Sequence, residues 1–155
     1  MQQVLVSHSR PLAIPLSSPL KELLAYAYAS RDRLREEIVA GCQSRFPHYG
    51  ALSAAEVAGL RENVDYLISG FYLRQVGEGR LPVASELEAP RRMARLRVAQ
   101  GVPLAEMIGC YQIGLPVLWG DLVGRVDADN PVQLELLKRV PVTISAMTLA
   151  TTAVT

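Results

Sequence analysis

A regular apolar repeat in the second half of the chain constrains the fold more than any other feature. Large apolar side chains recur there at spacings of four, three, four, three and four: Leu104, Ile108, Tyr111, Leu115, Leu118 and Leu122. This spacing keeps returning to one side of an α-helix, so it predicts a helix with one buried face. Pro103 suits the first turn of that helix, whereas Pro116 in its interior predicts a kink.

Two further helices are predicted in the first half of the chain. The first spans residues 19–46, and Ser18 is its expected N-cap. The second begins at Ser53, where Glu56 stands at the spacing of a capping box. It ends in the Gly-Glu-Gly sequence at 77–79, a typical C-terminal stop.

A short basic helix and a long apolar one complete the pattern. The short helix has Pro90 in its first turn and ends at Gly101. The long helix begins near Asp129 or Asn130, should bend at Pro141, and runs to the end of the sequence. Because the sequence stops inside that apolar helix, we expect a fragment of a longer protein or a helix that ends in a dimer interface.

The sequence shows no strand alternation, hairpin turn or βαβ spacing, so the predicted class is all-α. We expect an irregular leader over residues 1–18 and one bundle of about five helices over residues 19–155. Half of the 155 residues are apolar, which suffices for a hydrophobic core without disulfides or metals.

Charge and hydropathy limit the partners of such a domain. Sixteen basic residues stand against fifteen acidic ones, and a formal net charge of +1 argues against a nucleic-acid-binding surface. The uncharged stretch 140–155 is shorter than the roughly 20 residues that a membrane-spanning helix needs. We therefore expect a cytoplasmic domain that contacts neither nucleic acid nor membrane.

The residue inventory contains no recognisable catalytic machinery. His8 falls in the leader and His48 in a turn, so neither lies beside carboxylates at metal-ligand spacing. Cys42 and Cys110 form no CxxC pair, and packing is the expected role of both thiols. Phosphate-loop, dinucleotide-binding and nucleophile-elbow motifs are missing from the sequence. We expect a domain that is no enzyme and has no catalytic residues, cofactor or metal site.

The strongest charge feature is a run of arginines in the short helix: Arg91, Arg92, Arg95 and Arg97. Anion or nucleic-acid binding is one interpretation of this run. Solvated arginines, some of them paired with acids of neighbouring helices, are the interpretation that the sequence favours.

Four glycines interrupt the helix that carries the apolar repeat: Gly109, Gly114, Gly120 and Gly124. Because glycine disfavours helix interiors, something must approach this helix closely: a neighbouring helix, a second subunit or a ligand. The ligand hypothesis places an apolar small molecule beside a set of mostly aromatic residues: Phe71, Tyr72, Tyr111, Leu115 and Trp119.

Several sequence blocks agree at once with one known family. The turn FPHY at 46–49, the block RLRVAQGVPL at 95–104, YQIG at 111–114 and VLW at 117–119 together resemble the RsbT co-antagonist (RsbRD) N-terminal domain. The resemblance covers roughly residue 38 to the end of the chain. In bacterial transcription regulators, this domain commonly precedes a helix-turn-helix region of the PucR/CdaR type.

The resemblance implies a helical bundle, related in some members to a globin without haem. It also implies a homodimeric sensor domain that relays a signal to a C-terminal DNA-binding region, which this sequence lacks. The alternative is an interaction scaffold of a partner-switching stress-signalling complex without a small-molecule ligand. The resemblance transfers no catalytic residues.

Overall fold

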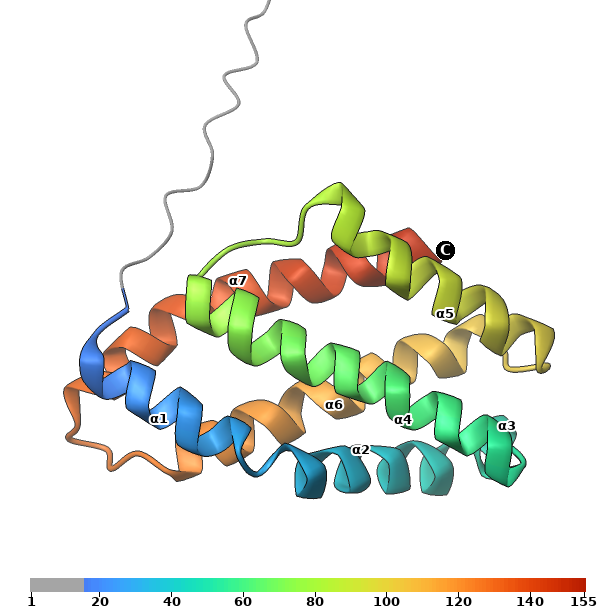
Figure 1. Cartoon of the computed structure of the whole chain (residues 1–155), viewed down its shortest axis with the longest axis horizontal. Coiled ribbons are helices and arrows are strands. Elements are labelled where there is room, and N and C mark those ends of the chain that lie inside the picture. The colour runs from blue at the N-terminus through green and yellow to red at the C-terminus, as the bar shows by residue number, and fades with distance from the viewer. Residues whose placement is uncertain (1–15) are drawn as a thin grey trace, which may run out of the picture.

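Residues 16–155 are described by a computed structural model, and every regular element in that range is helical (Figure 1). The predicted all-α class is therefore confirmed for these residues. The elements are α1 (Ser18–Tyr28), α2 (Arg31–Arg45), α3 (Pro47–Gly50), α4 (Ala54–Ser69), the π-helix η1 (Gly70–Glu78), the 3₁₀-helix η2 (Ala84–Leu87), α5 (Glu88–Ala99), α6 (Leu104–Gly124) and α7 (Pro131–Val154). Most of the expected leader, residues 1–15, lies outside the described residues.

The helices surround one hydrophobic core. Helix α2 packs against α4 and α6, and α7 packs against η1, α5 and α6. In Figure 1, α1 and α2 form the lower edge of the bundle and α7 and α5 the upper edge. The repeat that predicted α6 reaches the centre of this core, where Leu118 and Leu122 are fully buried.

Three predicted helix boundaries are confirmed by their local geometry. Ser53 Oγ accepts a hydrogen bond from the backbone N–H of Glu56, and the Glu56 carboxylate accepts one from the backbone N–H of Ser53. At the start of α7, Asn130 Oδ1 accepts a hydrogen bond from the N–H of Val132. After α5, Gly101 has a φ of 82°, a conformation that glycine adopts without steric cost.

The first predicted helix was wrong in its extent, because it is two helices. The break lies at Ala29 and Ser30, with no Gly or Pro to mark it. Tertiary contacts account for it: Arg125 donates a hydrogen bond to Ser30 Oγ. Both helices contact α6, but α1 also packs on η1 and α7, whereas α2 packs on α3 and α4. The N-cap of α1 is Ser17, whose Oγ accepts from Leu20 N–H, and not the predicted Ser18.

The predicted turn at 46–50 contains a single helical turn, α3. The second predicted helix does run to residue 78, but its last nine residues form a π-helix. It stops at Gly79, whose φ is 62°. Helices α6 and α7 each continue through their internal prolines, Pro116 and Pro141.

Two of the four glycines in α6 allow a close approach between helices. A Cβ at Gly109 would lie 2.2 Å from Cζ of Phe46, and one at Gly114 would lie 2.7 Å from Cδ2 of Leu67. A Cβ at Gly120 or Gly124 would meet nothing within 4 Å. The neighbouring-helix explanation therefore holds for the first two glycines and not for the last two.

Candidate ligand pocket

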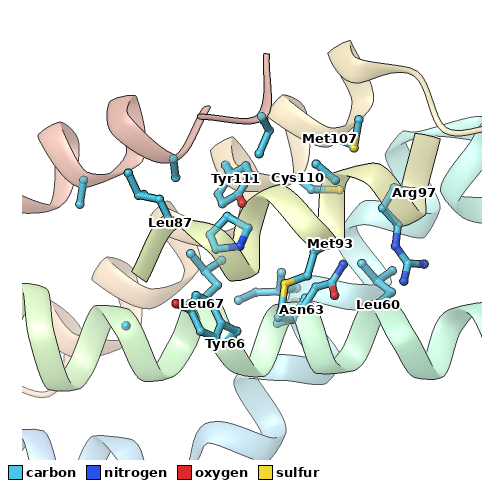
Figure 2. Close-up of a pocket in the computed structure, with 18 of the residues that line it drawn as sticks. Leu60, Asn63, Tyr66, Leu67, Leu87, Met93, Arg97, Met107, Cys110 and Tyr111 are labelled. Carbon is cyan, nitrogen blue, oxygen red and sulfur yellow. The ribbon is translucent and has the colours of Figure 1, made fainter. Parts of the chain in front are cut away.

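A pocket of about 110 Å³ lies in the bundle among α4, α5, α6 and α7 (Figure 2). A water molecule needs roughly 10–15 Å³ of such space, so the pocket suits on the order of ten non-hydrogen atoms. Apolar side chains make up most of its wall, among them Ile38, Leu60, Val64, Leu67, Met93, Met107, Ala146, Ala150 and Val154. The pocket is thus suited to a small, mainly apolar molecule.

The α7 side of the pocket is built from small residues. Ala146, Ala150 and Val154 recur at intervals of four along that helix, so they share one face. Met93 of α5 and Met107 of α6 contribute flexible thioethers to the wall. Methionine side chains adapt to irregular shapes, so this wall can adjust to an occupant.

Arg97 also lines the pocket, although its side chain belongs to the arginine run that was expected to be solvated. It is only 2% exposed, so the expectation was wrong for this residue. Its Nη1 donates to the backbone oxygen of Glu56 at 3.1 Å and to Oε1 of Gln100 at 2.6 Å. Its Nε and Nη2 have no hydrogen-bond partner among residues 16–155. Loss of water contacts on burial lowers the pKa of Arg97.

The surroundings of Arg97 leave room for its guanidinium group. Figure 2 shows the side chain reaching from α5 toward α4, beside Leu60. A Cβ at Gly59 would lie 2.6 Å from Nη2 of Arg97, so only glycine fits there without displacing the guanidinium. The other arginines of the run follow the expectation: Arg91 pairs with Glu88 at 2.8 Å, and Arg92 and Arg95 are exposed.

The sequence contained a signal for the burial of Arg97. The buried residues of α5 are Pro90, Ala94 and Arg97, at spacings of four and three. This is the spacing of an inward helical face, and Arg97 completes it. Grouping the four arginines by charge alone obscured this pattern.

A compact ion network borders the pocket beside η1 and η2. Arg80 donates to both carboxylate oxygens of Glu86, at 2.8 and 3.0 Å, and Arg74 lies 3.6 Å from the same carboxylate. Tyr66 Oη donates to the backbone oxygen of Glu86 at 2.7 Å. Hydrogen bonds from Arg80 lower the pKa of Glu86, which stays ionised and neutralised at neutral pH.

Two thiols and a phenol stand on the α2 and α6 side of the pocket. Cys42 is fully buried, and a hydrogen bond to Cys42 together with burial raises the pKa of Cys110. Burial likewise raises the pKa of Tyr49. Cys110 and Tyr49 therefore stay protonated at neutral pH, and with Cys42 they add apolar surface and weak dipoles to the wall.

The five residues of the ligand hypothesis do not all lie in the pocket. Only Tyr111 lines the pocket, where burial raises its pKa. Phe71 packs edge-on against Trp119 and Tyr72, with ring centroids 5.3 and 5.1 Å apart. Leu115 is half-buried against the core. Ligand binding by these residues stays a prediction.

His48 belongs to no metal-binding cluster in the part of the chain that the structure describes. His48 Nδ1 lies 2.8 Å from Oε1 of Glu106, and His8 lies outside the described residues. Across residues 16–155, no three His, Cys, Asp or Glu side chains come together in a group that could hold a metal ion. No helix in this range is long and apolar enough to cross a membrane.

Comparison with known protein families identifies the family to which the chain is similar. The family model described as the RsbT co-antagonist protein RsbRD N-terminal domain matches residues 32–154, which include every helix that contributes to the pocket. No curated protein and no solved structure matches the chain.

Proposed function

The chain belongs to the RsbT co-antagonist protein RsbRD N-terminal domain family, a family of signalling domains, and from that premise we propose a sensory and dimerisation function. The domain serves a cytoplasmic bacterial transcription regulator and relays a signal to a DNA-binding region outside residues 1–155. The observation that carries this proposal is that two faces of α7 differ in their surroundings. One face is an exposed apolar stripe, and the other lines the pocket.

The outer face of α7 has the spacing of a helix-pairing surface. Its exposed residues Leu134, Leu137, Pro141, Ile144 and Thr148 follow one another at intervals of three, four, three and four. Leu134 is 60% exposed, Leu137 64% and Ile144 50%. These five residues, which we call the α7 stripe, carry no charge. A heptad spacing of exposed apolar residues is typical of a surface that packs against another helix.

A second copy of the chain is the partner that fits the α7 stripe best. Two uncharged stripes can pack around a two-fold axis without burying a charge, whereas a charged partner surface would gain nothing from them. The proposed homodimer therefore pairs α7 with α7.

The inner face of α7 connects the dimer to the pocket. Ala146 and Ala150 line the pocket and follow Ile144 of the α7 stripe by two and six residues, so both lie within two helical turns of it. A ligand that fits one position of α7 better than another would therefore bias the packing of the two copies. This coupling needs no catalysis.

A scaffold function is the second candidate, in which the domain binds protein partners of a partner-switching complex and no small molecule. The observation that favours it lies on a different helix, α5, where Leu96 is 50% and Val98 59% exposed. Such residues could serve a second, different partner.

Sedimentation velocity and native mass spectrometry on the purified chain together test the proposal. The sensory function predicts a dimer at micromolar concentration and a small molecule retained in, or accepted by, the folded protein. A chain that stays monomeric at high micromolar concentration would contradict the dimer. A dimer that never takes up a small molecule would favour the scaffold.

A further inference from the structure

The pocket holds one buried positive charge without a counter-ion. Two cationic side chains line it, Arg74 and Arg97, and Glu86 is the one acidic side chain that does so among the described residues. Arg74 and Glu86 lie within ion-pair distance of each other, at 3.6 Å. No carboxylate of residues 16–155 lies within that distance of Arg97. A buried cation without a carboxylate at ion-pair distance is costly, so a ligand that neutralises Arg97 would gain affinity.

The two unpartnered nitrogens of Arg97 are the ones that bind carboxylates side-on. Nε and Nη2 lie on the same edge of the planar guanidinium, and each points one N–H in nearly the same direction. A carboxylate accepts such a pair with both oxygens at once, which makes the bond strong and directional. Nη1, on the other edge, is already occupied by Glu56 and Gln100.

The rest of the wall defines the other end of the ligand. Leu60, Met93 and Met107 surround the space with apolar atoms, and Ala150 leaves room on the α7 side. A second negative charge on the ligand would find no further free cation there, so a monoanion fits better than a dianion such as a phosphate monoester.

We propose that this pocket binds a small monocarboxylic acid, with its carboxylate on the Nε–Nη2 edge of Arg97 and its apolar tail between α4 and α7. The inference deepens the proposed sensory function, on which it rests, by naming the chemical class of the signal. The tail lies against Ala146 and Ala150, so its length and shape act directly on α7.

Calorimetric titration of the whole chain with octanoate tests the proposal, because octanoate has the size that the pocket volume suggests. The matched probes are 1-octanol and octylamine, which keep the tail and replace the carboxylate. We expect octanoate to bind about tenfold or more tightly than 1-octanol, and octylamine not to bind. Equal affinities for octanoate and 1-octanol, or no binding of octanoate, would overturn the proposal.

A variant pair assigns the effect to Arg97. Arg97→Met should remove the preference for octanoate over 1-octanol, whereas Arg95→Met, an exposed arginine on the same helix, should leave it unchanged. Circular dichroism verifies that both variants fold. If Arg97→Met fails to fold, Ala150→Leu is the substitute variant. Its larger side chain fills the apolar end of the pocket and should weaken octanoate binding. Unchanged octanoate binding in a folded Arg97→Met protein would refute the assignment.

The oligomeric state of the same samples separates this inference from the proposed function. A dimer that ignores octanoate would refute the ligand class and leave dimerisation standing. A monomer that binds octanoate through Arg97 would refute dimerisation and leave the ligand class standing.

Discussion

The indole Nε1 of Trp119 donates a 2.9 Å hydrogen bond to Oγ1 of Thr143, and this bond joins α6 to α7 inside the bundle. Thr143 is fully buried, and its own hydroxyl donates to the backbone oxygen of Val140. Because Thr143 faces inward from the helix that carries the α7 stripe, the bond helps to fix which side of α7 faces outward. It also places the single tryptophan of the chain beside the helix proposed to relay the signal.

Replacing Thr143 with valine should weaken this connection. The substitution keeps the shape of the side chain but leaves the half-buried indole N–H without an acceptor, so we expect a loss of about 1–2 kcal/mol in the free energy of unfolding. Urea denaturation followed by tryptophan fluorescence measures it. Thr152→Val is the control, because Thr152 is exposed and bonds only to the backbone of its own helix. Equal stability of the two variants would contradict the role of the bond.

Two glycines of α6 should respond in opposite ways to alanine. A methyl group at Gly109 would collide with the Phe46 ring, so Gly109→Ala should destabilise the fold by about 1–3 kcal/mol. Gly120 has open space around its Cβ position, so Gly120→Ala should stabilise by about 0.5–1 kcal/mol through helix propensity alone. Thermal denaturation of both variants checks the pair. A shift of the same sign for both would contradict the packing described for Gly109.

The sequence predicted most of the helices, because caps and apolar spacing are local signals. The capping box at Ser53, the Asn130 cap and the stop at Gly101 were all recognisable from residue types at fixed offsets. The break at Ser30 was not, because it depends on a hydrogen bond from Arg125, about a hundred residues away. The π-helical geometry of η1 was equally hidden, since its residues also suit an ordinary α-helix.

The pocket could be predicted only in part, for a different physical reason. Tyr111 was identified because aromatic residues beside glycines suggested a cavity. Phe71 and Trp119 carry the same signal, but their rings pack edge-on against each other instead of lining the pocket. Arg97 was missed because charge usually means exposure, whereas here the periodicity of α5 places it inside.

Tyr72 predicts a loss of stability at alkaline pH. Its buried hydroxyl has no hydrogen-bond partner in the described residues, and burial raises the pKa of Tyr72 from 10.0 to about 12. The folded state therefore keeps a proton that the unfolded chain has lost between these values. The contribution of protonated Tyr72 to the free energy of unfolding is complete below pH 10. It is lost as the pH rises toward 12, and the total loss is up to about 3 kcal/mol.

Tyr72→Phe isolates this contribution. At neutral pH the variant should be as stable as the parent or about 1 kcal/mol more stable, because it removes an unsatisfied hydroxyl. Above pH 10 its advantage should grow. Urea denaturation at neutral pH and above pH 10 measures the difference in the free energy of unfolding between the variant and the parent. A difference that is the same at both pH values would disagree with the raised pKa of Tyr72.

The thiols should be slow to react in the folded protein. Cys42 is fully buried, and the hydrogen bond to Cys42 and burial both keep Cys110 protonated at mildly alkaline pH. A chromogenic disulfide reagent should label both only after unfolding in urea. Ala40→Cys on the exposed side of α2 supplies a fast-reacting reference in the same protein. Immediate labelling of the folded parent protein would contradict the burial of Cys42 or the raised pKa of the half-buried Cys110.

The central claim is that the α7 stripe holds two copies of the domain together, and sedimentation velocity of Leu137→Glu tests it most directly. Ala40→Glu is the matched control, because it adds the same charge at an exposed position of α2. Helix α2 lies at the opposite edge of the bundle from α7 (Figure 1). We predict that the parent and Ala40→Glu sediment as dimers and that Leu137→Glu sediments as a folded monomer. A monomeric parent, or a Leu137→Glu protein that remains dimeric, would contradict the account.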